Sequence, residues 1–435
     1  MSDTRESAKA AARLLFYRDF EYQELFDGIS GMLLLGGDGN PEAAFKYAGE
    51  LVEIGVTHGF EGNLWHCFLA FCLANNENAY SRSCEIVGPV AGSLNQLVLH
   101  DFAVFKRLFD ADIAALDGLD EESRGIWSCI RDYRSATGRS QVFNSRIRDR
   151  IVELSVALEG AESAESFAAI VTEFYREFGV GRFGLNKAFR IDDIESGSRA
   201  VIKPITSIEH VYLKDLVGYE LQKKKLIANT EAFIQGKAAN NVLLYGDSGT
   251  GKSSSIKAIL NQYYDRGLRM IEVYKHQFKN LSDVLEQIKD RNYKFIIYMD
   301  DLSFEDFEIE YKYLKAIIEG GLGKKPTNVL IYATSNRRHL IREKFSDKRE
   351  ILDDLHANDT VQEKLSLVAR FGVTIYYGSP DKKEFQNIVR VLAEKYGVHM
   401  DQEQLLLEAN KWELSHGGLS GRTASQFITH LMGQD

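Results

Sequence analysis

The sequence predicts an α/β fold in which a parallel sheet lies between two helical regions of the chain. From about residue 213 onward, short apolar runs alternate with segments of helical periodicity. Near-continuous apolar runs are typical of a parallel sheet that is buried on both faces. We therefore expect a five-stranded parallel sheet, with strands at residues 241–245, 268–274, 294–299, 328–333 and 373–377.

The region before residue 213 predicts a mainly α-helical N-terminal domain. Apolar residues recur there at three- and four-residue spacing, as in the set Ile147, Ile151, Leu154 and Leu158. Glycines then interrupt the helical period, a polar stretch follows at 192–199, and the chain is helical again after Pro380. We expect a helical N-terminal region at 1–185, a linker at 186–212, an α/β domain at 213–378 and a C-terminal helical lid at 379–435.

The composition limits the classes of function that the chain can serve. Its 435 residues are 44% apolar and 27% charged, which is ordinary for a globular protein of two or three domains. The most apolar short run, at 32–35, falls far short of the roughly 20 residues that span a bilayer, and no signal-peptide pattern opens the chain. We expect a cytoplasmic protein without membrane contact. The net charge of −10 does not support a nucleic-acid partner.

The cysteines predict no metal or redox site. Their spacings fit neither a CxxC pair nor a zinc ligand set, and each lies in an apolar stretch, where a thiol behaves as a small buried hydrophobe. The four residues are Cys67, Cys72, Cys84 and Cys129.

The segment 246–253 matches the phosphate-binding pattern G-x-x-x-x-G-K-[ST]. Its glycines let successive backbone N–H groups face a phosphate, Lys252 adds a positive charge, and the Ser253 hydroxyl is a ligand for Mg²⁺. An apolar strand leads into the loop and a helix leaves it, which argues against a fortuitous match. The pattern predicts a site for ATP whose contacting residues are Gly246, Asp247, Ser248, Gly249, Thr250, Gly251, Lys252, Ser253 and Ser254.

A second apolar strand ends in the paired carboxylates Asp300 and Asp301. The carboxyl end of a buried parallel strand faces the ligand crevice, so Asp300 is expected to hold Mg²⁺ together with Ser253. Asp301 stands where AAA+ ATPases usually carry a glutamate that polarises the attacking water. Its shorter side chain implies a closer water or slow hydrolysis. Glu305 is an alternative base, and Asp301 could instead serve as a supporting or capping carboxylate.

The fourth apolar strand ends in Asn336, whose amide is expected to act as a sensor of the γ-phosphate or of the attacking water. The three residues that follow, Arg337, Arg338 and His339, have two interpretations. They form either a solvated turn or a contact with a neighbouring subunit.

Two arginines are candidates for stabilising the transferred phosphate. Arg370 precedes the last strand and would reach the site of a neighbouring subunit in a ring, the alternative being an ordinary surface arginine. Arg422 opens the last lid helix and would reach the phosphates of its own chain. Upstream of the phosphate loop, Leu216 and Val217 are expected to pack on adenine.

Together these motifs resemble an uncharacterised bacterial family of AAA+ P-loop ATPases, catalogued as a domain of unknown function, number eight hundred and fifteen. The resemblance covers about residues 210 to 430 and rests on the segments 228–233, 241–246, 300–305, 332–340 and 420–424. The family also carries paired aspartates at the second strand end. Val368-Ala369 depart from the serine-aspartate pair expected before Arg370, which leaves the interface role of that arginine less secure.

The resemblance implies an AAA+ fold with ATP and Mg²⁺ as cofactors, and names no substrate. We expect an ATPase that forms a homo-oligomeric ring, a hexamer being one size, and that binds a protein partner through its N-terminal region. The alternative is a scaffold that binds ATP with little hydrolysis. A small-molecule kinase is less favoured, because such enzymes carry an arginine-rich lid within the α/β core, whereas segment 342–360 has mixed charges.

Overall fold

The computed structural model describes residues 13–35, 41–88, 92–118, 124–134, 145–192, 199–206, 208, 211–304, 310–319, 326–336 and 367–433. Two compact units divide the chain, Met1–Asn186 and Lys187–Asp435. Among the described residues, no helix combines the length and the apolar character that crossing a bilayer requires.

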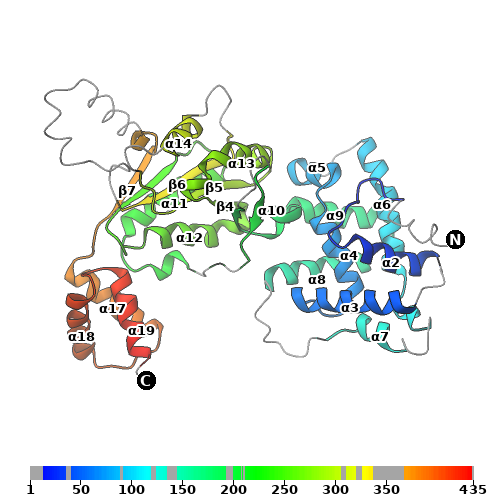
Figure 1. The fold of residues 1–435 in the computed structure, drawn as a ribbon, viewed down its shortest axis with the longest axis horizontal. Helices are drawn as coiled ribbons and strands as arrows, with labels where there is room; N and C mark the ends of the chain where they lie inside the picture. The colour runs from blue at the N-terminus through cyan, green and yellow to red at the C-terminus, as the bar shows by residue number, and fades with distance from the viewer. Residues whose placement is uncertain are drawn as a thin grey trace. The chain divides into compact units, whose positions relative to one another are not determined.

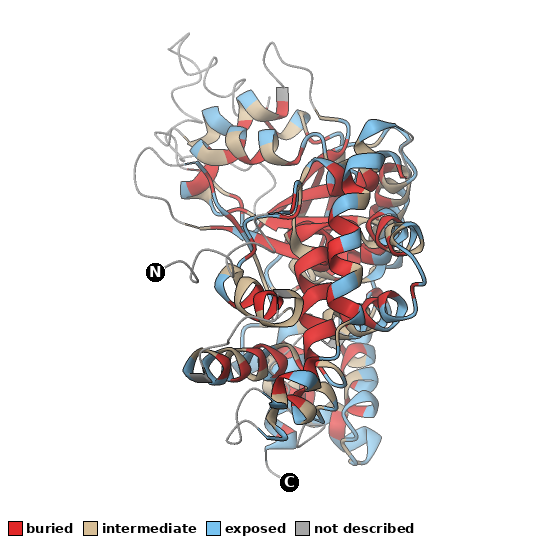
Figure 2. Ribbon diagram, turned by 90° about the vertical axis from the view of Figure 1, so that its right-hand side faces the viewer, coloured by how far each residue is buried: buried red, intermediate tan, exposed pale blue. Residues whose placement is uncertain are grey.

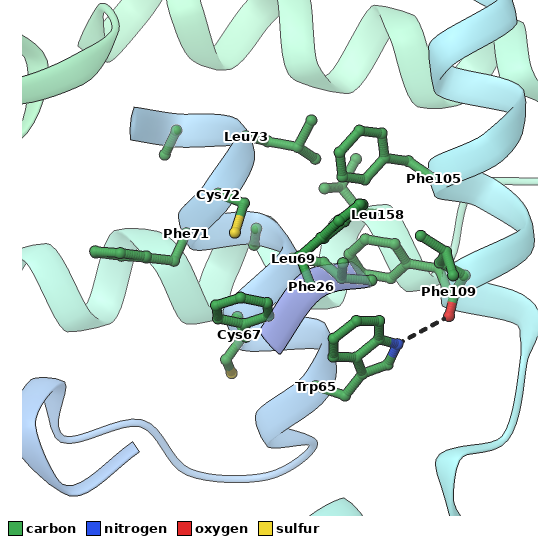
Figure 3. Close-up of a cluster of buried hydrophobic side chains, with 14 of the residues drawn as sticks. Phe26, Trp65, Cys67, Leu69, Phe71, Cys72, Leu73, Phe105, Phe109 and Leu158 are labelled. Carbon is green, nitrogen blue, oxygen red and sulfur yellow. Dashed lines mark hydrogen bonds between the residues drawn. The ribbon is translucent and has the colours of Figure 1, made fainter. Parts of the chain in front are cut away.

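The elements described in the first unit are helices, joined by turns and loops (Figure 1). Its central helix, α4, is buried from Leu64 to Ala74, because apolar residues occupy every side of it. Figure 3 shows aromatic side chains gathered around this helix, with Trp65 donating a hydrogen bond to the Leu108 carbonyl. The helices of this unit are α2 (Gln23–Leu35), α3 (Pro41–His58), α4 (Leu64–Asn75), α5 (Ala79–Val87), α6 (Ser93–Asp110), η2 (Ile113–Gly118), α7 (Ile126–Arg131), α8 (Ser145–Glu159), α9 (Ala164–Phe178) and α10 (Gly181–Leu185).

Three of the four cysteines are buried in this unit, as a small hydrophobe would be, whereas Cys129 is exposed. Cys129 lies on the short helix α7, which turns Trp127 and Ile130 toward the core instead. The expectation that all four are buried was therefore wrong for Cys129.

Among its described residues, the second unit contains a sheet of seven strands rather than five, in the order β2-β1-β4-β5-β6-β3-β7. Two added strands lie within the stretch expected to be a linker. The five expected strands are present and parallel, β1 joins them in parallel, and β2 is antiparallel to β1. The strands are β1 (Ala188–Ile191), β2 (Ile202–Pro204), β3 (Val242–Gly246), β4 (Leu268–Glu272), β5 (Lys294–Met299), β6 (Val329–Ser335) and β7 (Val373–Tyr377).

Helices cover both faces of this sheet. Apolar residues of α11 (Glu220–Ile234) and α12 (Lys252–Tyr263) pack on one face, and α13 (Leu281–Ile288) and α14 (Glu310–Glu319) lie against the other. In Figure 2 the strands are buried along most of their length, while the outer sides of the helices are exposed. Short 3₁₀ turns complete the layer at η4 (Leu213–Asp215), η5 (Tyr264–Arg266) and η6 (Lys275–Asn280).

Three helices follow β7 and share a small apolar core of their own. They are α17 (Lys382–Lys395), α18 (Gln402–Ser415) and α19 (Gly421–Met432). Side chains at their N-caps, from Asp381, Asp401 and Ser420, accept hydrogen bonds from the first-turn N–H groups.

Candidate functional site

The sheet brings three chemically distinct strand ends together at one edge. Strand β6 lies between β3, which leads into the phosphate loop, and β5, which leads into Asp300. Tyr245 of β3 pairs with Ser335, and Met299 of β5 pairs with Ala333. The phosphate loop, the paired aspartates and Asn336 therefore emerge side by side, where the ligand crevice of a parallel sheet lies.

Glycine is required at two positions of the phosphate loop. Gly246 has φ 135°, and a Cβ atom there would lie 2.1 Å from the carbonyl oxygen of Tyr377 on the adjacent strand. Gly249 has φ 75°, and its Cβ would lie 3.0 Å from the Cβ of Arg422. A larger residue would thus combine backbone strain with a collision.

The Lys252 side chain is buried, with 6% of its surface exposed, and its ammonium group lies inside the loop. It donates to the carbonyls of Gly246 (3.0 Å) and Asp247 (2.6 Å) and to Oδ1 of Asn336 (3.0 Å). Burial lowers the pKa of Lys252 from its ordinary value, while nearby carboxylates, Asp247 foremost, act in the opposite direction. The loop therefore holds a poorly solvated cation next to its own backbone.

Ser253 and Asp300 form the oxygen pair that the sequence predicts as a metal site. The Ser253 hydroxyl donates to Oδ1 of Asp300 at 2.7 Å, and the Thr334 hydroxyl donates to the same oxygen at 2.6 Å. Burial alone would raise the pKa of Asp300, but the hydrogen bonds from Thr334 and Ser253 lower it below its ordinary value. An ionised carboxylate beside a hydroxyl fits Mg²⁺, which takes hard oxygen ligands from one or two side chains.

Asp301 and Asn336 face each other across the strand ends. Asp301 has φ 49°, an uncommon left-handed conformation for a residue other than glycine, and its N–H donates to the Thr334 hydroxyl at 2.9 Å. The Asn336 amide donates to Oδ1 of Asp301 at 2.8 Å and accepts from Lys252. One amide side chain thus links the cation of the phosphate loop to the second aspartate.

These groups line a cavity of about 860 Å³, to which the C-terminal helices also contribute. Leu216 and Val217 line it together with Ile388, Leu392 and Tyr396, so this end is largely apolar. Many of the residues that the sequence predicts for the nucleotide site line this cavity. They are Leu216, Val217, Ser248, Gly249, Thr250, Gly251, Lys252, Ser253, Ser254, Asp300, Asp301, Asn336 and Arg422.

Two lysine side chains make contacts at the apolar end of this cavity. The Lys223 ammonium donates to the Leu216 carbonyl at 2.8 Å. Lys395 of α17 pairs with Asp215 at 2.9 Å, and this hydrogen bond lowers the pKa of Asp215 from its ordinary value, although burial opposes it. The segment next to Leu216 is therefore tied to the C-terminal helices as well as to its own helix.

The two predicted arginines occupy different places. Arg422 lies in the first turn of α19, and its backbone N–H donates to the Gly249 carbonyl at 3.2 Å, so this helix begins directly on the phosphate loop. Arg370 lies in the turn before β7, where its N–H donates to the Leu367 carbonyl at 3.3 Å. Of the described residues that line the cavity, none is Arg370.

Sequence reasoning missed several residues that hold the site. Thr334 binds both aspartates, Lys223 binds Leu216, and Ser379 binds the Asp247 carboxylate. A hydroxyl at the end of an otherwise apolar strand is a weak signal for Thr334, and no spacing rule marks the other two. The expectations for Glu305, Arg337, Arg338 and His339 lie outside the described residues.

Comparison with known proteins gives one family match and several partial ones. The family described as "Protein of unknown function (DUF815)" matches residues 185–435. The chromosomal replication initiator protein DnaA of Chloroflexus aggregans is 24% identical over 195 residues, which cover 43% of this chain and 37% of DnaA. The replication factor C large subunit of Staphylothermus marinus is 33% identical over 73 residues, or 17% of this chain and 16% of that protein. The chain thus spans well under two thirds of these relatives.

Solved structures give weaker likenesses. A variant of RuvB from Thermotoga maritima has a TM-score of 0.36 and 17% identity, over 50% of this chain and 63% of that one. The AAA domain of FIGL-1 in complex with ADP has a TM-score of 0.35 and 18% identity, over 52% and 74% of the two chains.

Proposed function

This chain belongs to the family described as a protein of unknown function (DUF815), and we propose that it is a Mg-ATP-dependent ATPase of the AAA+ type. Its hydrolysis of ATP to ADP and phosphate drives the remodelling or switching of a partner. The supporting observation is the 2.7 Å contact between Ser253 of the G-x-x-x-x-G-K-S loop and Asp300 of the neighbouring strand end. A hydroxyl and a carboxylate at this spacing are what a nucleotide-bound Mg²⁺ draws from a P-loop protein.

In this proposal, each group of residues in the cavity has its own role. The loop N–H groups and Lys252 bind the triphosphate, and Leu216 and Val217 contact the base. Ser253 and Asp300 would hold Mg²⁺, which, when bound, neutralises charge on the phosphate oxygens. Asp301 accepts a proton from the attacking water, and Asn336 orients that water, since its amide already joins Asp301 to Lys252.

A complete site draws on two chains in this proposal. Arg422 acts within its own chain, because it begins the helix that is bonded to Gly249. Arg370 acts on the neighbouring chain in a homo-oligomeric ring, where its charge stabilises the transferred phosphate. The N-terminal region expected to be helical, 1–185, then carries the partner that responds to the nucleotide.

A second candidate is a scaffold that binds ATP and hydrolyses it little. One observation favours it: the short Asp301 side chain already accepts the Asn336 amide at 2.8 Å, which fixes one of its oxygens. The two candidates predict the same binding and differ in turnover.

Phosphate release by the full-length protein distinguishes the candidates. We expect measurable turnover for the wild type and for Lys382→Ala, a control that removes an exposed lysine outside the cavity. Lys252→Ala should lose both binding and turnover, whereas Asp301→Asn should retain binding and lose turnover by about 100-fold or more. Binding without wild-type turnover would support the scaffold. Turnover that persists in Lys252→Ala would refute the proposed site.

A further inference from the structure

The C-terminal helices are joined to the sheet through the connection between β7 and α17. β7 ends at Tyr377 and α17 begins at Lys382. The covalent path between the sheet and the three helices therefore runs through a few residues. Any rotation of these helices must change backbone angles in this connection, whose first part, residues 377–379, we call the hinge segment.

Each residue of the hinge segment is hydrogen-bonded by a residue from the nucleotide site. The Asp247 N–H donates to the Tyr377 carbonyl at 3.0 Å, and the Tyr219 hydroxyl donates to the Gly378 carbonyl at 2.8 Å. The Ser379 N–H and hydroxyl both donate to Oδ2 of Asp247, at 2.8 and 2.9 Å. The first of these bonds continues the pairing of β3 with β7, and the other three involve the side chains of Tyr219, Asp247 and Ser379.

The Asp247 carboxylate has an unusual place for an acid in a phosphate loop. A negative charge here repels the phosphates that the loop is built to bind. Of the described residues that line the cavity, none is Asp247, because its side chain turns to Ser379. The carboxylate thus serves the hinge segment, while the Asp247 carbonyl accepts from Lys252 inside the loop.

Tyr219 makes the corresponding link from the base end of the cavity. It follows Leu216 and Val217 closely in sequence, lines the cavity, and stacks on Tyr377 with ring centroids 5.1 Å apart. Burial raises the pKa of Tyr219 to about 12, so its hydroxyl stays protonated and remains a donor to Gly378.

We propose that Asp247 and Tyr219 form a clamp on the hinge segment, through which occupancy of the phosphate and base ends of the cavity sets the orientation of the C-terminal helices. This proposal rests on the proposed function. Its consequence is the placement of Arg422, because the same helices carry that arginine to the Gly249 carbonyl. Asp247 and Tyr219 are accordingly positioning residues that act through Arg422.

Amide hydrogen exchange of the full-length protein tests the clamp. The variants are Asp247→Ala and Tyr219→Phe, which removes the hydroxyl and keeps the ring. Tyr376→Phe, which removes an exposed hydroxyl on the adjacent strand residue, is the matched control. Without nucleotide, Asp247→Ala should speed exchange of the Ser379 amide about tenfold or more, since that N–H loses its acceptor. Mg-ATP should slow exchange of 378–381 and of the first turn of α19 in the wild type and control.

In the two clamp variants we expect Mg-ATP to bind within about threefold of the wild-type affinity, because Asp247→Ala leaves the loop backbone in place and Tyr219→Phe keeps the ring that lines the cavity. The nucleotide-dependent slowing should be absent, and kcat should fall while KM changes little. Asp247→Asn, which keeps a neutral acceptor for Ser379, should restore part of both effects. This rescue separates positioning from a general loss of structure.

Slowing by Mg-ATP that is unchanged in Asp247→Ala and Tyr219→Phe would overturn the clamp. If Asp247→Ala does not fold, Tyr219→Phe and Asp247→Asn carry the same test. A wild type that binds no Mg-ATP would overturn the proposed function and the clamp's nucleotide response with it. Exchange of the Ser379 amide without nucleotide does not depend on ATP binding. Its rate in Asp247→Ala therefore tests the clamp contact separately from the proposed function.

Discussion

At the scale of single residues, three side chains are linked at the candidate site. Lys252, Asn336 and Asp301 form a continuous chain of hydrogen bonds from the phosphate loop to the second aspartate. Asn336, in the middle, is neutral, and it uses its amide oxygen as an acceptor and its NH₂ group as a donor. One amide therefore connects the two charged side chains.

Asn336→Ala tests this link. The variant removes the donor to Asp301 and one of three acceptors of Lys252, but leaves the loop glycines and the Ser253–Asp300 pair unchanged. We expect ATP affinity within a few-fold of the wild type and hydrolysis reduced about 10- to 100-fold. Nucleotide titration and single-turnover hydrolysis measure the two quantities. Loss of affinity equal to the loss of rate would contradict a role in positioning the water.

Thr334 shows why part of the site could not be predicted. Asp300, Asp301 and Asn336 could be predicted because each directly follows an apolar strand. Thr334 binds both aspartates through the register of β5 against β6, which pairs Met299 with Ala333. This register depends on tertiary packing, so it cannot be predicted from the sequence of one strand.

At the scale of elements, the five strands from β3 to β7 could be predicted, whereas β1 and β2 could not. β3, β5 and β6 are near-continuous runs of apolar residues because helices cover both of their faces. β1 and β2 have four and three residues, and both carry a charged residue, Arg190 and Lys203. Strands this short and partly polar are hard to tell from a linker, because three or four residues show too little alternation of apolar and polar side chains to identify a strand.

The junction of β3 with the phosphate loop gives a prediction about stability. Gly246→Ala would place a Cβ atom 2.1 Å from the Tyr377 carbonyl oxygen at a positive φ, so we expect a loss of about 3 kcal/mol and no nucleotide binding. Gly267→Ala is the control, because Gly267 also has a positive φ, 86°, with nothing within 4 Å of its Cβ position. It should cost roughly 1 kcal/mol. Urea unfolding measures both, and equal losses would contradict the role assigned to the close approach of β7.

The pair between Asp215 and Lys395, which joins the base segment to α17, gives a pH-dependent prediction. The pKa of Asp215 is lowered by Lys395, so the stabilisation is present above the ordinary aspartate pKa of about 3.9 and disappears as the pH falls through the lower folded value. Lys395→Met should cost roughly 0.5 kcal/mol at pH 7, because the pair is partly exposed. Urea unfolding at pH 7, 5 and 3.5 measures this difference.

The outcome at low pH decides the interpretation of that pair. The difference between wild type and Lys395→Met should persist at pH 5 and shrink below about pH 4. Lys411→Met, which removes an exposed pair within a single helix, α18, is the control for the loss of a lysine that joins no separate elements. A difference that is constant down to pH 3.5 would mean that Lys395 contributes by packing rather than by charge.

At the scale of the whole molecule, a single chain supplies every group that the proposed mechanism needs except the second arginine. Arg422 is supplied by the chain itself, whereas Arg370 is not among the described residues around the cavity. The sequence alone assigned both arginines by their position relative to strands and helices. The difference between them became visible with the arrangement of the C-terminal helices.

Mixing two inactive variants tests whether Arg370 serves a neighbouring chain. Arg370→Ala retains Asp301, and Asp301→Asn retains Arg370. A ring assembled from the two variants therefore has some interfaces at which Asp301 of one chain meets Arg370 of its neighbour. In a heterologous ring about a quarter of the interfaces of an equal mixture should be of this kind. We therefore expect each variant to be inactive alone and the mixture to release phosphate. An inactive mixture of folded, co-assembled variants would contradict the shared site.

Equilibrium binding of Mg-ATP to the full-length protein, measured by titration calorimetry, is the most direct test of a phosphate loop that works with Ser253 and Asp300. Saturable binding should occur with the wild type, be lost in Lys252→Ala, and weaken in Asp300→Asn in a way that depends on the Mg²⁺ concentration. A wild type that gives no binding heat, or a Lys252→Ala variant that binds as tightly as the wild type, would contradict the account.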